Sequence, residues 1–173
     1  MDRRSALKNA GIAGVLATGL APAVHAQANI RWRLTSSFPK SLDTLYGVSE
    51  VFSKKVNEMS GGKFQITAHG PGELVPAFGT VDATKAGTVE CSHTAPYYYF
   101  GKDPTFAIGC AIPFGLNSRQ MTAWMYDGNG LKLTREFYAG MDIINFPCGN
   151  TGAQMGGWWR KEIKSLADLK GQK

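Results

Sequence analysis

The chain has 173 residues, with 19 lysines and arginines against 13 aspartates and glutamates, and so a formal net charge of +6. The basic residues are spread along the chain, and the densest group, residues 160–164, holds only three, which argues against a nucleic-acid-binding protein. A mild positive excess instead favours the capture of small anions.

The first 26 residues have the composition of an export signal. Two arginines stand at residues 3–4, small and apolar residues fill positions 10–23, and residues 24–26 place small side chains where a signal peptidase needs them. The arginine pair resembles a twin-arginine signal, but Ala6 stands where a bulkier apolar residue is common, so ordinary secretion stays open. We expect an exported, periplasmic protein without a permanent membrane anchor.

Strand and helix patterns alternate over the next part of the chain. Strands are predicted at residues 30–35, 63–69 and 89–94, and helices at residues 42–59 and 75–86. Two strand–helix units that lead into a third strand predict an α/β fold with a mostly parallel sheet flanked by helices.

The spacing of apolar residues predicts the buried face of each helix. Ser41 is the expected N-cap of the first helix. Its apolar face is predicted to consist of Leu42, Leu45, Val48, Phe52, Val56 and Met59. In the second helix Phe78 and Val81, three residues apart, are expected to face inward.

Polar residues and a phenylalanine follow the first strand directly. The carboxyl ends of strands are the usual place for ligand contact in open α/β sheets, which makes Ser37 and Phe38 candidate binding residues. Plain capping of the following helix is the alternative explanation for Ser36 and Ser37.

Four consecutive aromatic residues, 97–100, lie between two prolines just after the third strand. Phenol groups hydrogen-bond carboxylates while their rings exclude water, so one or two of Tyr97, Tyr98 and Tyr99 are candidate ligand contacts. Neighbouring residues of an extended segment point to opposite faces, and the others are therefore expected to pack against the body. Aromatic packing under a surface loop is the alternative for each.

The later part of the chain predicts a second set of elements. Residues 106–114 are apolar and predict a buried connection. A helix capped by Ser118 and a second helix over residues 131–140 follow. Further predictions are a strand at residues 142–147, a strand-like segment at residues 158–163 and a short capped helix at residues 165–171.

The loop of residues 149–159 contains four glycines, two amides and two tryptophans. Glycine lets backbone amides approach a ligand closely, and amide side chains both donate and accept hydrogen bonds. The loop is therefore a candidate binding loop, with Asn150 and Gln154 as its ligand residues. A glycine-rich crossover between two packed elements is the alternative.

Reactive side chains form no catalytic pattern. Cys91, Cys110 and Cys148 lack the spacing of a metal site or redox pair, and their neighbours predict buried apolar roles. Cys91 and His93 share one strand face without an orienting acid. Hydrolase, nucleotide-binding and metal-binding motifs are missing from the sequence, which disfavours an enzyme. Neutral oxygens such as Gln154 Oε1, with a ligand carboxylate, could still hold a cation.

Five segments together resemble the extracytoplasmic solute-binding proteins of tripartite ATP-independent periplasmic (TRAP) transporters, in particular those that bind 2-oxo acids such as pyruvate. They are residues 32–44 (WRLTSSFPKSLDT), 72–76 (GELVP), 87–94 (GTVECSHT), 97–106 (YYYFGKDPTF) and 149–158 (GNTGAQMGGW). They cover nearly the whole chain after the signal, in order.

The resemblance implies the first lobe of a two-lobed type II periplasmic-binding-protein-like fold, truncated. Residues 27–148 would form that lobe, and residues 149–173 the crossover and the start of an incomplete second lobe. The implied function is periplasmic capture of a 2-oxo acid or related monocarboxylate for delivery to the TRAP permease subunits. A homodimer is compatible with it, and no cofactor is expected apart from a sodium ion bound with the substrate.

The resemblance also implies roles for particular residues. Gln154 would contribute to both the substrate and the sodium site, and Asn150 and one of the three tyrosines would contact the substrate. The family grips the carboxylate with an arginine on the strand that follows the segment ending here, and this sequence lacks it. We therefore expect an amino-terminal fragment that binds substrate weakly.

Two other functions remain open at this point. The first is a free-standing secreted α/β domain, in which Cys91 or His93 would serve an enzyme. The second is a structural or dimerisation domain, which would need a continuous apolar surface that the sequence does not single out.

Overall fold

The computed structural model describes residues 29–110, 112–152 and 154–172. The export signal predicted for residues 1–26 lies outside the described residues. Among those that are described, no helix has both the length and the apolar character needed to cross a membrane.

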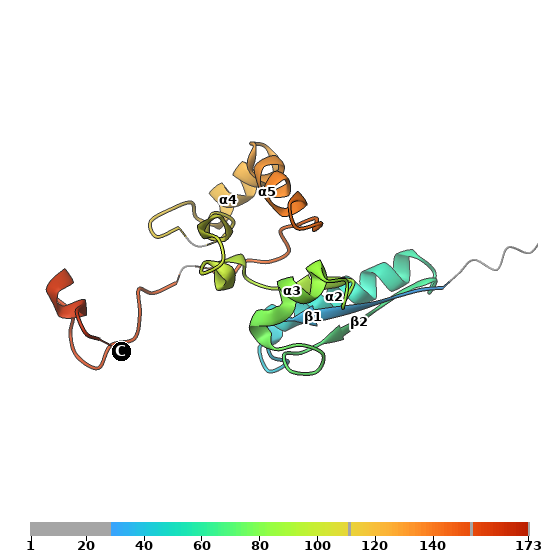
Figure 1. The fold of residues 1–173 in the computed structure, drawn as a ribbon, viewed down its shortest axis with the longest axis horizontal. Coiled ribbons are helices and arrows are strands. Elements are labelled where there is room, and N and C mark those ends of the chain that lie inside the picture. Colours follow the sequence, from blue (N-terminus) through green and yellow to red (C-terminus); the bar gives the residue numbers. More distant parts are fainter. Residues whose placement is uncertain (1–28, 111, 153, 173) are drawn as a thin grey trace, which may run out of the picture.

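A parallel sheet of three strands organises the first half of the chain (Figure 1). Its strands are β1 (Ile30–Ser36), β2 (Phe64–His69) and β3 (Cys91–His93), in the order β2-β1-β3. The pairing places Leu34 opposite both Ala68 and Cys91. The expected α/β class and parallel sheet are confirmed, although β3 is shorter than the predicted strand.

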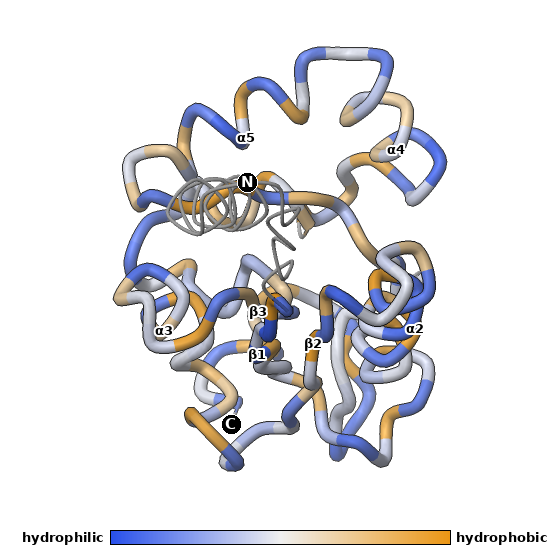
Figure 2. Tube along the Cα trace, turned by 90° about the vertical axis from the view of Figure 1, so that its right-hand side faces the viewer, coloured by the Kyte–Doolittle hydropathy of each residue, from blue (hydrophilic) through white to orange (hydrophobic). Residues whose placement is uncertain are grey.

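Helices flank the strands on both sides. Viewed along the strands in Figure 2, α2 (Asp43–Met59) and α3 (Thr80–Lys85) lie on opposite sides of them. In β1 the exposed residues come first and the buried ones last, from Leu34 to Ser36. The buried core of the sheet therefore lies toward the carboxyl ends of its strands.

The buried face of α2 differs from the predicted apolar face. Tyr46 and Ser49 are its buried residues, whereas Leu42, Phe52 and Met59 are exposed. Ser49 forms a hydrogen bond with His93 of β3, and a small hydroxyl residue lets the helix approach the sheet there. The other three predicted residues, Leu45, Val48 and Val56, are half-buried, so the predicted face is correct in part.

The predicted caps and bounds of two helices were also wrong. Ser41 lies in a turn, and Leu42 occupies the N-cap position of α2 without a side-chain hydrogen bond. The single helix expected at residues 75–86 is a 3₁₀ turn, η1 (Ala77–Gly79), followed by the short α3. The tighter turn rotates the side chains, so Val81 is buried but Phe78 is 66% exposed.

The aromatic segment is helical rather than extended. Residues Pro96–Tyr99 form the 3₁₀ helix η2, and Pro104–Ala107 form η3. These turns place Tyr99 and Phe106 in a buried cluster with Val81 and Tyr138. Among the described residues of the predicted buried connection at residues 106–114, only Phe106 and Ala107 are buried, and Phe114 is fully exposed with a φ of 57°.

Two helices in contact with each other follow. They are α4 (Ser118–Tyr126) and α5 (Gly130–Ala139). Asn117, not Ser118, caps α4, through a reciprocal pair of bonds with Gln120. Gly130 is required at the turn, because a Cβ there would come within 2.7 Å of the Trp124 ring.

Beyond α5 the chain is largely extended and exposed, and neither predicted strand forms. Residues 142–147 lie along α5 instead: Asn145 Nδ2 donates to Thr134 Oγ1 at 3.1 Å, and Arg135 stacks 4.9 Å from the Phe146 ring. A strand needs a neighbouring strand to satisfy its backbone, and none of the described residues provides one here. Residues 158–163 are likewise irregular, and Trp158 is 89% exposed.

The final described element is the 3₁₀ helix η4 (Leu166–Leu169), which matches the predicted short capped helix. Ser165 and Asp168 form its capping box. The three cysteines are free, but only Cys91 is half-buried; Cys110 and Cys148 are exposed, contrary to the predicted buried roles. Cys148 is exposed because it belongs to the extended stretch after α5.

Candidate functional site

The strand order defines where a ligand would bind. The chain leaves β1 for β2 on one side and then crosses to β3 on the other, so the carboxyl ends of β1 and β3 form the switch point of the sheet. Ligands of open α/β proteins bind at such a switch point. The two ends are joined directly, since the backbone N–H of Ser37 donates to the His93 carbonyl at 2.9 Å.

Ser37 lies at this junction, but its hydroxyl is committed to the protein. Its Oγ lies 2.6 Å from the Ala77 carbonyl oxygen, 2.7 Å from Thr94 Oγ1 and 3.3 Å from Thr80 Oγ1. The side chain is buried. Ser37 therefore ties the ends of β1 and β3 to η1 rather than presenting a hydroxyl to a ligand.

Tyr99 is likewise a supporting residue. It is only 2% exposed, and its phenol oxygen lies 2.7 Å from Thr80 Oγ1 and accepts from the Val81 N–H at 3.3 Å. The ring packs in the core against Phe106. Of the three candidate tyrosines, the geometry thus leaves Tyr97 and Tyr98 for ligand contact.

Four aromatic side chains form a wall beside the switch point, which we call the aromatic wall: Phe38, Phe78, Tyr97 and Tyr98. Tyr98 is at its centre, with ring centroids 4.8 Å from Tyr97, 5.2 Å from Phe78 and 6.3 Å from Phe38. Both tyrosines are partly exposed. Burial and, after it, the hydrogen bond with Tyr97 raise the pKa of the Tyr98 phenol, which stays protonated and able to donate.

A buried histidine lies beneath the aromatic wall. His93 is 9% exposed, its Nδ1 is 3.0 Å from Ser49 Oγ, and its ring centroid is 5.0 Å from that of Phe38. Burial lowers the pKa of His93. Burial also raises the pKa of Cys91 to about 11, which disfavours its reactive thiolate form.

The glycine-rich loop begins near the same end of the sheet. The nearest atom to a Cβ built on Gly149 is Val48 Cγ2 of α2, at 3.8 Å. Asn150 Oδ1 accepts from the Gly152 N–H at 2.6 Å, and Gln154 Nε2 donates to Thr151 Oγ1 at 2.9 Å. These bonds shape the loop from within, and both amides are exposed to solvent.

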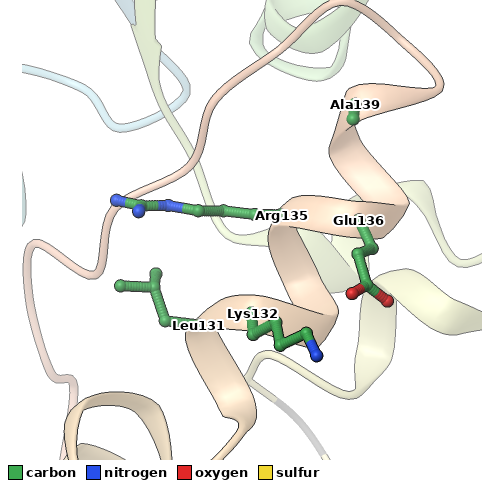
Figure 3. A pocket seen from close by; sticks show the side chains of 5 residues that line it. All are labelled: Leu131, Lys132, Arg135, Glu136 and Ala139. Atoms are coloured by element: carbon green, nitrogen blue, oxygen red, sulfur yellow. The ribbon is translucent and has the colours of Figure 1, made fainter.

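Two surface hollows lie elsewhere. One, of about 480 Å³, runs along α5 and is lined by Leu131, Lys132, Arg135, Glu136 and Ala139. Figure 3 shows Leu131 and Arg135 on one side of the helix and Lys132 and Glu136 on the other, so its polar groups do not converge on one point. The second, of about 360 Å³, lies between α3 and α5 beside the ion pair of Lys102 and Asp82.

Phe78 and Ser49 are the site residues that the sequence analysis missed. Phe78 was expected to face inward, and Ser49 gave no signal because it lies outside the apolar periodicity of its helix. No group of three or more histidine, cysteine or acidic side chains suited to a metal ion occurs among the described residues.

The sequence profile of the bacterial extracellular solute-binding proteins of family 7 matches residues 35–173, which is more than half of the chain. The chain belongs to this family. The resemblance to TRAP solute-binding proteins is thereby confirmed, and the described fold matches part of a solved protein of this kind.

Three similar proteins illustrate the relationship. The monocarboxylate 2-oxoacid-binding periplasmic protein of Nostoc sp. is 49% identical over all of this chain and 49% of its own length. A TRAP solute-binding protein from Bordetella bronchiseptica, solved with calcium and picolinate, is 49% identical with a TM-score of 0.79, over 83% of this chain and 43% of its own. One from Pseudoalteromonas atlantica, solved with sodium and pyruvate, is 38% identical with a TM-score of 0.79, over 83% and 44%.

The chain thus spans about half the length of the family 7 relatives it matches. The candidate site described above lies within the part of the family's length that this chain spans.

Proposed function

We propose that this chain takes part in the periplasmic capture of a 2-oxo acid or a related monocarboxylate, bound with a cation, for delivery to a TRAP permease. The observation that carries the proposal is the aromatic wall at the β1/β3 switch point, where two phenols stand at the position expected of a ligand site. The 49% identity to a monocarboxylate 2-oxoacid-binding relative supports the ligand class.

The aromatic wall suits a small organic carboxylate. The Tyr97 and Tyr98 phenols can donate hydrogen bonds to a carboxylate, while the exposed Phe78 ring excludes water from one side of it. The buried Phe38 ring supports Tyr98 from behind. A dicarboxylate would bring a second charge against apolar rings without a positive partner among these four residues. The wall therefore favours one carboxylate at one end of a short molecule.

Gln154 fits the role of one cation ligand. Its Nε2 is engaged with Thr151, which leaves the carbonyl Oε1 as the atom to bind a hard cation. Asn150 serves the substrate in the proposal and also holds the loop through Gly152. Because the chain spans about half of the family's length, we propose that the other cation ligands come from the substrate carboxylate and from the remainder of the family's fold.

The half of the family's length spanned here supplies one wall of the site. A ligand bound against one wall alone would stay largely exposed to solvent, and small ligands bind tightly mainly when most of their surface is buried. We propose that the 173-residue chain binds its ligand weakly, that it is exported by its amino-terminal signal, and that the complete site needs the remainder of the family's fold. A second copy of this chain is also a compatible partner, in a homodimer.

We also propose that the chain is not an enzyme. Cys91 has a raised thiol pKa and points its Sγ at the Arg33 carbonyl at 3.9 Å, and His93 is buried against Ser49. Neither reaches the other as nucleophile and base must. The alternative of a free-standing enzyme has no observation in its favour.

A ligand titration followed by nuclear magnetic resonance tests the proposal. The full chain, with labelled tyrosines and glutamines, would be titrated with pyruvate in sodium and, separately, in potassium salt. We expect a dissociation constant on the order of 1 mM or weaker, with shifts at Tyr97, Tyr98 and Gln154 that are larger in sodium. Gln154→Ala should remove the sodium dependence, whereas Gln172→Ala, an exposed glutamine of the same carboxyl-terminal stretch, should keep it.

Each part of the proposal has its own contrary result. Shifts confined to Tyr138 of α5, away from the aromatic wall, would reject the site, and equal shifts in both salts would reject the cation. Binding in the micromolar range would show that this half of the family's length suffices for a tight site.

A further inference from the structure

We propose that His93 is a positioning residue of the ligand site, and that it holds the aromatic wall in place through Phe38 while Ser49 of α2 holds the imidazole. The inference deepens the proposed function, because it gives the wall an internal support. His93 would act without touching the ligand.

The contacts form a continuous path from the core to the surface. Ser49, 1% exposed, lies 3.0 Å from His93 Nδ1. The imidazole packs edge-on to Phe38 at 5.0 Å and 64°, and Phe38 in turn packs against Tyr98 at 6.3 Å and 54°. Tyr98 is the partly exposed centre of the wall. A change in the tilt of the His93 ring would therefore reach Tyr98 through the Phe38 ring alone.

Phe38 has little freedom to adjust by other means. It is buried, and its backbone N–H donates to Ser36 Oγ at 3.1 Å, which fixes the chain just before the side chain. The rotamer of Phe38 is then decided by the two rings on either side, His93 inside and Tyr98 outside. A residue that only filled space would not need the directional bond from Ser49.

The described contacts of the imidazole bring no charge to it. They are the Ser49 hydroxyl from α2 and the Phe38 ring from the loop after β1. The backbone of His93 pairs with those of Ser36 and Ser37 across the sheet, which are also uncharged. A neutral imidazole suits these surroundings, because a buried charge without a partner is costly. Protonation would strain the same contacts that position Phe38.

Aromatic resonance signals of the full chain test the proposal without any ligand. Ser49→Ala removes the bond to His93, and we expect the ring signals of Phe38 and Tyr98 to move while those of Tyr126 on α4 stay in place. Ser53→Ala is the matched control, since Ser53 lies one turn further on α2 and its hydroxyl donates to the Ser49 carbonyl instead. Signals of Phe38 and Tyr98 that move equally in both variants, or in neither, overturn the proposal.

A second measurement needs no substitution and covers the case in which Ser49→Ala fails to fold. When the pH of the unsubstituted chain is lowered, the Phe38 and Tyr98 signals should follow the titration of His93 itself. Signals that stay constant while His93 titrates overturn the positioning role.

Titration with sodium pyruvate separates this inference from the proposed function. We expect Ser49→Ala to bind roughly threefold to tenfold more weakly than the unsubstituted chain, with Ser53→Ala unchanged. If the Phe38 and Tyr98 signals move in Ser49→Ala but the unsubstituted chain binds no pyruvate, the proposed function is rejected and the positioning role is supported. Equal affinity of Ser49→Ala and the unsubstituted chain would reject the positioning role alone.

Discussion

The carboxylate of Glu90 accepts three hydrogen bonds from Arg33. The backbone N–H of Arg33 donates at 2.7 Å, Nε at 3.1 Å and Nη2 at 2.7 Å. Arg33 belongs to β1 and Glu90 directly precedes β3, so this pair sets the register of the two strands whose ends form the candidate site.

The first prediction concerns acid stability. The side-chain and backbone hydrogen bonds of Arg33 lower the pKa of Glu90 to about 2. The stabilisation is therefore fully present above the ordinary carboxyl pKa and is lost as the pH falls through about 2. Glu90→Gln should lower the melting temperature at neutral pH by a few degrees at most, because the pair is solvent-exposed.

The measurement is the thermal unfolding of the unsubstituted chain and of Glu90→Gln between pH 7 and pH 2. The difference in melting temperature should shrink toward the acid end. A difference that is constant over the whole range would show that the Glu90 carboxylate is not the stabilising group.

A second prediction distinguishes Tyr99 from Tyr97, two tyrosines of the same aromatic segment. Tyr99→Phe removes the phenol that meets Thr80 Oγ1 and the Val81 N–H inside the core, and should lower the free energy of unfolding by about 1–3 kcal/mol. Tyr97→Phe, on the partly exposed wall, should change it by less than about 0.5 kcal/mol. Urea denaturation of the two variants compares them, and a larger effect at Tyr97 would contradict the assignment of Tyr99 to the core.

The third prediction follows from the burial of His93. Because burial lowers its folded-state pKa, the unfolded chain takes up the proton first, and stability should fall as the pH drops below the ordinary value near 6.5 toward the lowered folded value. His93→Gln has no group that titrates there, so its urea midpoint should vary less between pH 7 and pH 5. If the two proteins lose stability in parallel over this range, another group is responsible.

The fourth prediction concerns the start of α4. Asn117→Ala removes a side chain that accepts from the Gln120 N–H at 3.0 Å and should cost about 1 kcal/mol. Ser118→Ala, at the first helical position, should be close to neutral or slightly stabilising, since alanine is the better helix former. Chemical denaturation measures the free energy of unfolding of both variants. A larger loss of stability in Ser118→Ala than in Asn117→Ala would show that Ser118 is the N-cap, as expected from the sequence.

Local patterns predicted those elements whose formation depends on neighbours in the chain. The strands at residues 30–35 and 63–69 and the helix at residues 131–140 each agree with the structure to within one residue at either end. Alternation and helical spacing are properties of a short segment, so they can be recognised without knowing how the rest of the chain packs.

Predictions failed where a distant residue decides the outcome. The strand expected at residues 142–147 has no neighbouring strand among the described residues, and its Asn145 bonds to Thr134 instead. The buried residues of α2, Tyr46 and Ser49, lie outside the predicted apolar stripe, and Ser49 meets His93, which is 44 positions away. A pattern of hydrophobic residues contains no information about such a polar contact.

The candidate site shows the same division. By itself the sequence determined the family, the order of the first strands and helices, and the segments that flank the switch point, since these depend on local composition and on motif residues. Only the tertiary structure decided that Tyr98 is the exposed centre of the aromatic wall while Tyr99 and Ser37 are fixed inside. The reason is physical: Ser37 and Thr80 are 43 positions apart, and which hydroxyl is satisfied within the protein depends on chain packing that brings such distant groups together.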